Sequence, residues 1–489
     1  MAGSLTRWDW RRPPASLVAL AAMLVALAVN HAGYRGGGAD DWQYLEAARC
    51  AVAHHGLCVP ESHWWARFPL VAPMAAAIAL AGESRLTLGL VPLLYAAASL
   101  VLLTLLVERR FGRAEAIVAG LLMATLPSVA LVLLQPNVDT AELAFTLGAL
   151  LMLQAAATSK RARDAMAGGL LLGLAVLTRP SALAWLPILA LAAAAMPALR
   201  RLALPAALGL AAPLLAEALV YWLWLGDPLH SWALSLGHTS IPSAELPPGF
   251  HSARGPLLNP DYIAAWRPAM GIRVHWTVDP LLNLLANPAM GTLLVATLLL
   301  LALRRPSPRD PGGRALLWLL GAAILYFGAI IYCFAIDPKP RMFLPVAAAA
   351  ATIFAVQAAA LWRGGKRALA AAIGAVTVGM NLVYLATVPD LNGLEPAAAS
   401  WVRAYGPTLA VDDASRRFLT LVPGVRALPV DPPGAARFMI VSLGPCGEVE
   451  RFRAGWRIER AAIMTTAGGE QASLCLFSRP AGPAAAPPR

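Results

Sequence analysis

Two pairs of carboxylates stand at the starts of probable helices and could do acid–base chemistry. Asp40 and Asp41 are adjacent and open a segment that reads as a helix. Asp139 and Glu142 are three residues apart, so on a helix they share one face. Carboxylates gathered in this way can act as a general base or hold a divalent cation. Acidic residues at a helix start also cap exposed backbone N–H groups, and this simpler interpretation stays open for both pairs.

Four basic residues stand at breaks between apolar segments, where they can bind an anion. Arg179 precedes a proline and interrupts one apolar run, Arg85 follows a short apolar run, and Lys339 and Arg341 separate two others. A charged side chain at mid-membrane costs about 2.5–3.5 kcal/mol on insertion scales, so it normally faces a cavity or a partner. We predict a basic ring at headgroup level, where a lipid-linked phosphate would lie. Anchoring to lipid headgroups, or pairing of Arg179 with Glu217, is the alternative.

The elements that must position these side chains are membrane helices. The chain has 489 residues, of which 58% are hydrophobic and only 13% are charged, and its mean hydropathy is +0.62. Soluble globular proteins carry about 25% charged residues, and disordered chains are poor in apolar ones. The composition therefore excludes a water-soluble enzyme and a disordered protein. We predict an all-α polytopic membrane protein.

About eleven apolar segments are predicted to cross the membrane. They are residues 16–32, 86–107, 117–135, 141–157, 165–178, 181–197, 202–225, 290–303, 315–334, 342–361 and 368–388. A spanning helix needs about 20 mostly apolar residues, so the shorter apolar run 68–80 suits an interfacial helix better. Residues 165–197 are counted as two spans because Arg179 and Pro180 interrupt them.

Basic residues indicate the orientation of these spans. Eighteen of the 39 Lys and Arg residues fall in the N-terminal segment and in short loops on one side of the membrane. The positive-inside rule then predicts a cytoplasmic N-terminus and an external C-terminus. We expect an integral protein of the bacterial inner membrane whose +12 net charge reflects topology, with no nucleic-acid partner. Both carboxylate pairs then lie on the external face.

The external regions differ in length and composition. Residues 1–389 form the predicted membrane domain, with a first external loop at 33–84 and a large one at 226–288. Residues 390–479 carry more charge and alternate between short predicted strands and helices, which predicts a small external α/β domain. Residues 480–489 are rich in Pro and Ala and are predicted to be disordered.

Four of the five cysteines occur in pairs within external regions. Oxidised pairs require even numbers, so we predict disulfides Cys50–Cys58 and Cys446–Cys475. The sequence contains no Walker A, GxGxxG, HExxH or CxxC motif.

Taken in order, these residues resemble the GT-C superfamily of membrane glycosyltransferases, of the protein-mannosyltransferase and aminoarabinose-transferase type (glycosyltransferase family 39). The similarity covers residues 1 to about 390 and rests on an ordered set of motifs. They are Asp40-Asp41-Trp42-Gln43-Tyr44, Arg67-Phe68-Pro69, Gly82-Glu83-Ser84-Arg85, Pro136-Asn137-Val138-Asp139, Thr178-Arg179-Pro180 and Arg341-Met342-Phe343-Leu344-Pro345.

The resemblance implies site residues. Asp40 would be the essential carboxylate, with Asp41 as its acidic neighbour and Tyr44 positioning the substrate. Asp139 would match the acid of the second external loop. Two basic residues would match positions near the donor phosphate, namely Arg85 and Arg341.

The resemblance also implies an activity. A sugar on a polyprenyl phosphate would pass, with inversion, to a hydroxyl of a glycan, lipid or protein acceptor at the external membrane face. A divalent metal ion on Asp40 and Asp139 is the cofactor that the acids permit. The alternatives are a polysaccharide ligase or polymerase that uses Arg254, Arg267 or His275 in the 226–288 loop, and a membrane transporter.

Overall fold

The computed structural model describes residues 14–30, 39–237, 270–275, 277–333, 339–388, 394–430, 437–441, 456–465 and 471–479. Several sequence-based predictions fall outside the described residues. They concern Cys446, Arg254, Arg267, most of the 226–288 loop and the 480–489 tail.

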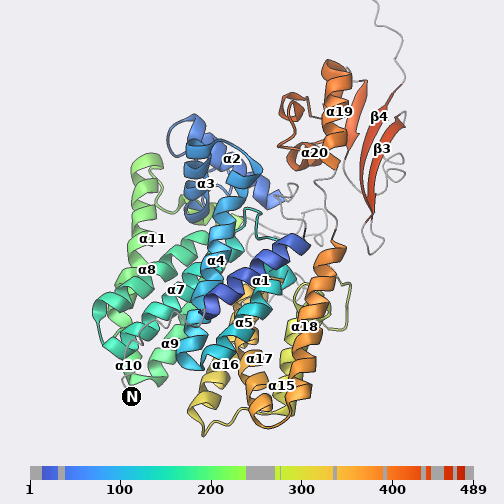
Figure 1. The fold of residues 1–489 in the computed structure, drawn as a ribbon. Coiled ribbons are helices and arrows are strands. Elements are labelled where there is room, and N and C mark those ends of the chain that lie inside the picture. The colour runs from blue at the N-terminus through green and yellow to red at the C-terminus, as the bar shows by residue number, and fades with distance from the viewer. Residues whose placement is uncertain are drawn as a thin grey trace, which may run out of the picture.

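All eleven predicted spanning segments contain helix, so the predicted all-α polytopic architecture is confirmed (Figure 1). The helices are α1 (Ala15–Val29), α4 (Arg85–Arg110), α5 (Arg113–Thr125), α7 (Val138–Ser159), α8 (Ala162–Thr178), α9 (Trp185–Ala195), α11 (Ala203–Leu225), α15 (Gly291–Leu303), α16 (Pro311–Cys333), α17 (Leu344–Arg363) and α18 (Arg367–Thr387). Among the described helices, six are long and apolar enough to cross a membrane. The bent pair α14 (Asp279–Ala286) and α15 would make a seventh.

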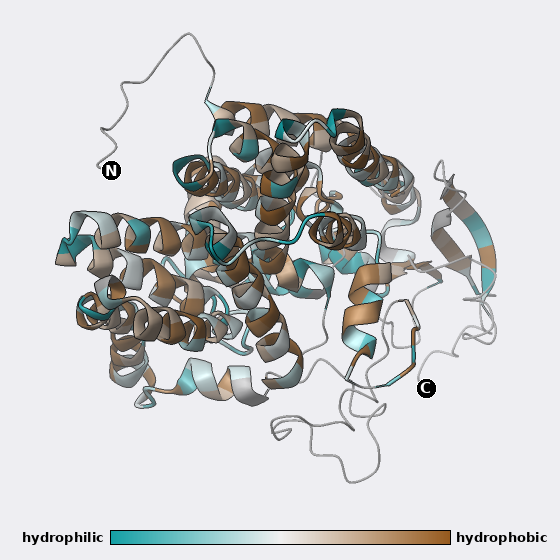
Figure 2. Cartoon of the chain, turned by 90° about the horizontal axis from the view of Figure 1, so that it is seen from below, coloured by the Kyte–Doolittle hydropathy of each residue, from teal (hydrophilic) through white to brown (hydrophobic). Residues whose placement is uncertain are grey.

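Apolar residues cover these helices on most sides (Figure 2). Buried leucines and alanines of α1, α4, α5, α7 and α17 form the largest core. By contrast, only 11% of the most apolar stretch of α11 is buried, and its exposed surface carries Leu208, Leu215 and Leu223. A helix that stays apolar on its exposed side is suited to contact with lipid.

Prolines interrupt the helices at two places, inside the predicted span 117–135 and between the predicted spans 165–178 and 181–197. Helix α5 ends at Thr125, and Pro127 begins the short helix α6 (Pro127–Ala130), because proline cannot continue the hydrogen-bond ladder of a helix. Helix α8 ends at Thr178, and the 3-10 helix η1 (Pro180–Ala184) follows. Arg179 between them is extended, as expected for a residue before proline. The predicted break at Arg179-Pro180 is therefore confirmed.

Glycines allow α8 and α11 to approach until their backbones touch. A Cβ atom at Gly169 would lie 1.9 Å from the Ala206 carbonyl oxygen, and one at Gly209 would lie 2.0 Å from the Met166 carbonyl oxygen. Small residues at such an interface let membrane helices pack by close van der Waals contact. This packing fixes the end of α8, and so the position of Arg179.

A layer of shorter helices covers one end of the bundle. Helices α2 (Ala39–Ala53) and α3 (Phe68–Ala81) pack on the start of α4 through a cluster that includes Tyr44, Leu45 and Leu70. Helix α3 has 14 residues, in agreement with the predicted interfacial helix. The predicted Cys50–Cys58 disulfide is confirmed and ties the end of α2 to the following loop. Further short helices of the membrane region are α10 (Pro197–Arg200), α12 (His230–Gly237) and η4 (Pro340–Phe343).

The C-terminal region, residues 394–479, contains the predicted small sheet. Strands β1 (Leu409–Val411), β2 (Phe438–Val441), β4 (Gln471–Ser478) and β3 (Arg457–Thr465) lie in that order, with β1 and β2 parallel and the other pairs antiparallel. Helices α19 (Glu395–Tyr405) and α20 (Asp413–Phe418) accompany the sheet (Figure 1). A separate core that includes Trp401 and Leu476 holds the region together.

Candidate active site

The start of α7 presents two buried carboxylates. Asn137 is the N-cap, and its Oδ1 accepts the Thr140 backbone N–H at 2.9 Å. Its side-chain amide donates to the carbonyl oxygens of Val132 and Gln135. The N-cap of α7 is therefore Asn137 and not Asp139. Asp139 and Glu142 are both buried on the same helix.

Arg179 neutralises these acids from the end of α8. Its Nη1 donates to Asp139 Oδ1 at 2.6 Å and lies 3.8 Å from Glu142 Oε2. On α16, the Tyr326 hydroxyl donates to Glu142 Oε1 at 2.7 Å. A buried carboxylate or guanidinium is costly unless it is paired and hydrogen-bonded, and here each is. The break at Arg179-Pro180 therefore places a cation inside the bundle with two acids as partners.

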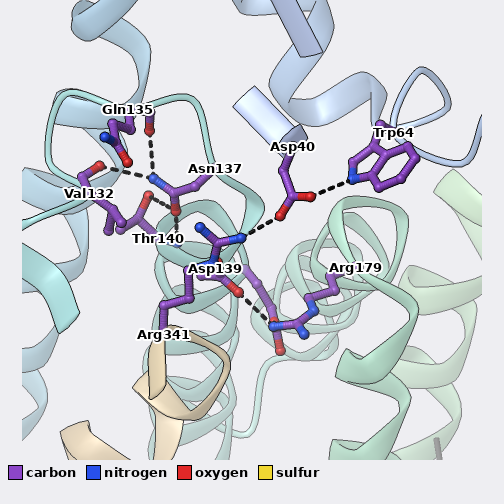
Figure 3. Close-up of polar contacts among 10 residues, drawn as sticks. Asp40, Trp64, Val132, Gln135, Asn137, Asp139, Thr140, Arg179 and Arg341 are labelled. Carbon is purple, nitrogen blue, oxygen red and sulfur yellow. Dashed lines mark hydrogen bonds and ion pairs between the residues drawn. The ribbon is translucent and has the colours of Figure 1, made fainter. Parts of the chain in front are cut away.

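Asp40 lies at the more open end of the same cluster (Figure 3). One carboxylate oxygen, Oδ1, accepts the Trp64 Nε1–H at 3.1 Å, and the other accepts from Nη2 of Arg341. The Nε atom of Arg341 also lies 3.3 Å from Asp139 Oδ2. The Asp40 side chain is 33% exposed, whereas the Asp139 side chain is 5% exposed. Arg341 therefore joins an accessible carboxylate on α2 to a buried one on α7.

Tyr44 and Arg67 lie beside this cluster with altered acidity. Burial, reinforced by the charge of Asp40, raises the pKa of Tyr44 well above its usual value, so Tyr44 is a neutral hydroxyl. Burial lowers the pKa of Arg67, although the charge of Glu217 opposes this shift. Arg67 Nη2 donates to Ser235 Oγ on α12 at 3.2 Å. A third buried guanidinium thus interacts electrostatically with Tyr44 and is hydrogen-bonded to α12.

The structure brings most of the predicted site residues together, but not all of them. Asp40, Asp139, Glu142, Arg179 and Arg341 form one network of ion pairs. Asp41 is buried next to Asp40 in the sequence. Because neighbouring positions of a helix do not face each other, its side chain points in a different direction from that of Asp40.

Among the described residues, two predicted phosphate-binding residues are not members of this ion-pair network. Arg85 pairs with Glu395 of the C-terminal region, and exposed Lys339 immediately precedes η4. Their predicted roles at the donor phosphate stay predictions.

Three residues next to the ion-pair network were not predicted from the sequence as site residues. Trp64 reads from the sequence as an interfacial tryptophan, but it donates to Asp40. Arg67 belongs to a motif used for the resemblance, yet its burial near Tyr44 is a tertiary feature. Tyr326 lies in the middle of an apolar run, 184 residues from its partner Glu142, so no local signal marks it.

The carboxylates surround arginines rather than a space for a cation. Arg341 contacts Asp40 and Asp139, and Arg179 contacts Asp139 and Glu142. Within the part of the chain that the structure describes, only Cys50, His54 and Cys58 bring three such ligand groups within 4.8 Å of one another. Their two sulfurs form the disulfide. The predicted metal site on Asp40 and Asp139 does not fit this arrangement, because an arginine already contacts each of these carboxylates.

An apolar cavity of about 220 Å³ begins below Glu142. At one end lie Tyr326 and Trp185, whose ring centroids are 5.4 Å apart. At the other end lie Arg110 and Gln154, and the wall between consists of leucines of α4 and α7 together with residues of α16 and α17, mostly alanines. The cavity therefore runs along the bundle from the ion-pair network toward the far end of α4.

Comparisons with known proteins support the same fold. Residues 69–224 match the family model of dolichyl-phosphate-mannose-protein mannosyltransferases. Comparison with curated protein sequences gives no match. The oligosaccharyltransferase of Archaeoglobus fulgidus, solved with Zn and sulfate, is 14% identical over 93% of this chain and 72% of that one, with a TM-score of 0.55.

Two further structures are similar at the same low identity. The Archaeoglobus enzyme tethered to an acceptor peptide is 14% identical over 86% of this chain and 60% of that one, with a TM-score of 0.50. ArnT from Cupriavidus metallidurans bound to undecaprenyl phosphate is 15% identical over 94% of this chain and 97% of that one, with a TM-score of 0.49. The match to the mannosyltransferase family model does not favour the transporter alternative. The resemblance is confirmed at the level of fold, and the chain is a polytopic membrane protein with the GT-C glycosyltransferase fold.

Proposed function

We propose that this chain transfers a sugar from a polyprenyl-phosphate donor to an acceptor hydroxyl, with Asp40 as the general base. The observation that carries the proposal is the contact between Asp40 and Arg341 at the open end of an otherwise buried ion-pair network. Glycosyl transfer needs a base beside the nucleophile and a cation beside the leaving phosphate. Asp40 and Arg341 supply these two groups at adjacent positions.

Asp40 is the carboxylate best placed to take a proton. Its side chain is partly exposed, and each of its oxygens accepts one hydrogen bond while having two lone pairs. Asp139 and Glu142 are buried and paired with Arg179, so they hold the arginines in place. In the proposed step the acceptor oxygen bonds to the anomeric carbon, its proton passes to Asp40, and the bond from that carbon to the phosphate oxygen breaks. A single displacement of this kind inverts the configuration.

Arg341 is the proposed partner of the leaving phosphate. A guanidinium has five N–H donors, and the contacts with Asp40 and Asp139 involve only Nη2 and Nε. The side chain is 27% exposed, so part of it faces outward from the network. Bidentate pairs between arginine and phosphate are among the strongest charge-assisted hydrogen bonds. Arg179 pairs with two buried acids beneath this position, so Arg341 is the guanidinium with N–H groups available to the phosphate.

The cavity below Glu142 suits the hydrocarbon tail of the donor. Its wall is apolar, and its upper end at Tyr326 is one hydrogen bond from the ion-pair network. A donor whose phosphate lies near Arg341 would then direct the first part of its lipid chain past Tyr326 into this cavity. The matched family model bears the name of an enzyme class that uses a sugar on dolichyl phosphate, which is a donor of the same chemical class.

The location and domain division belong to the same proposal. The positive-inside rule places the N-terminus in the cytoplasm and Asp40 on the external face of a bacterial inner membrane. Residues 1–389 would then be the catalytic membrane domain and residues 390–479 an external domain. The similar oligosaccharyltransferase was solved with an acceptor peptide, so a polypeptide is one acceptor to test, beside glycans and lipids.

Binding of a polyprenyl phosphate to the purified protein tests the proposal directly. Native mass spectrometry would compare wild-type protein with Arg341→Gln, using undecaprenyl phosphate as the probe. Arg309→Gln serves as control, because exposed Arg309 lies in the loop between α15 and α16. We expect wild type and the control to retain the lipid and Arg341→Gln to bind it at least about tenfold more weakly. Equal binding by all three proteins would contradict the proposed role of Arg341.

A further inference from the structure

The C-terminal region touches the helix that carries Asp40. Residues 416–426, which run from the end of α20 into the 3-10 helix η7 (Val425–Ala427), contact α2 and the link between α3 and α4. We propose that this stretch, named here the clamp segment, positions α2 and so holds Asp40 above Asp139. The inference rests on the proposed function, because it assumes that Asp40 is the base.

A chain of charges crosses the contact. Arg49 on α2 donates to both carboxylate oxygens of Glu83, at 3.1 and 2.5 Å. Arg426 of the clamp segment donates to the same two oxygens, at 3.1 and 3.2 Å. Glu83 is therefore shared between a guanidinium of the membrane domain and one of the C-terminal region. Arg49 also donates to the hydroxyl of Thr420, at 2.8 Å.

Trp42 lies within the same contact, two positions after Asp40. The Arg49 guanidinium lies 5.2 Å from its ring centroid, and the Arg416 guanidinium lies 6.0 Å from it. Both distances are within the range of about 6 Å for cation–π attraction. One of the two cations comes from α2 itself and the other from the clamp segment, so Trp42 joins the two regions.

Apolar packing reinforces the charged contact. Leu421 packs against the cluster that includes Tyr44, Leu45 and Leu70, and Thr420 is buried. Outside the clamp segment, Arg85 at the start of α4 pairs with Glu395 of α19. The C-terminal region therefore contacts α2, α4 and Glu83, which lies between α3 and α4.

The arrangement gives the C-terminal region a role in catalytic geometry. Asp40 is in the first turn of a 15-residue helix that lies outside the main core of the bundle. A displacement of a catalytic group by about 1 Å can cost a factor of about 100 in rate. Contacts that limit the motion of α2 would therefore raise kcat without contacting either substrate.

Hydrogen exchange and kinetics of the full-length protein test this inference. The variant Thr420→Val/Arg426→Ala removes the two polar contacts of the clamp segment with Arg49 and Glu83. Arg403→Ala is the matched control, since Arg403 is an exposed arginine of the same region for which the described residues provide no ion pair. We expect amides of 39–53 to exchange about fivefold faster in the double variant, while those of α7 keep their rates.

The kinetic arm separates positioning from general stability. We expect kcat of the double variant to fall about tenfold and KM for the lipid-linked sugar to change by less than about twofold. Unchanged exchange in α2, or faster exchange with an unchanged kcat, would overturn the inference. If wild-type protein transfers no sugar from any polyprenyl-phosphate donor, the proposed function fails. The exchange experiment would still decide whether the clamp segment restrains α2.

Discussion

Substitution by asparagine is predicted to destabilise the fold much more at Asp139 than at Asp40. Asp139→Asn removes the charge that faces Arg179 at 2.6 Å and Arg341 at 3.3 Å. Arg179 is buried, and its remaining acidic partner Glu142 is 3.8 Å away. Removing one member of a buried ion pair leaves the other charge uncompensated and typically costs about 3–5 kcal/mol. We therefore expect Asp139→Asn to destabilise the fold itself.

Asp40→Asn is the matched comparison. Asp40 is one third exposed, and exposed ion pairs contribute about 0–1 kcal/mol, so the free energy of unfolding should change little. Thermal unfolding of both purified variants in detergent checks this difference. Asp139→Asn should lower the apparent Tm by about 5 °C or more, and Asp40→Asn by less than about 2 °C. Equal stability of the two variants would refute the assignment of Asp139 as the buried holder of the arginines.

Three further predictions concern the surroundings of the site. Trp64→Phe removes the N–H donated to Asp40 and should lower kcat by about tenfold in a transfer assay, with a circular dichroism spectrum like that of wild type. Arg85→Glu and Glu395→Arg should each lower activity, because each breaks the ion pair between these residues. The double swap should restore activity if Arg85 acts through this ion pair. A double swap that stays inactive would instead support phosphate binding by Arg85. Gly209→Ala should destabilise the protein by about 1–3 kcal/mol in thermal unfolding, because its Cβ would meet the Met166 carbonyl, whereas Gly374→Ala on α18 meets open space and should not.

The sequence predicted what depends on local pattern. Apolar runs predicted the eleven helical segments, and Pro180 predicted the break that places Arg179. The even number of cysteines predicted the Cys50–Cys58 disulfide. The spacing of Asp139 and Glu142 correctly put both on one helix. These features follow from hydropathy, helix period, proline chemistry and cysteine count, which a single sequence displays.

Contacts between residues far apart in the chain could not be predicted from the sequence. Arg341 meets Asp40 across 301 residues, and Tyr326 meets Glu142 across 184 residues. Arg85 matched a phosphate position by resemblance, but its ion pair with Glu395 depends on how the C-terminal region docks. Whether two acids bind a metal or an arginine likewise depends on packing, which local spacing does not encode.

The central claim is that Asp40 activates the acceptor for transfer of a lipid-linked sugar. Mass spectrometry of lipids from a strain lacking the chain, complemented with wild type, Asp40→Asn or Asp227→Asn, tests it most directly. Asp227 is an exposed carboxylate following α11 and serves as control. A general base contributes about 10²–10⁴-fold. Asp40→Asn should therefore leave a polyprenyl-phosphate sugar accumulated as in the uncomplemented strain, while wild type and Asp227→Asn consume it. Consumption by a stably inserted Asp40→Asn protein at the wild-type level would contradict the claim.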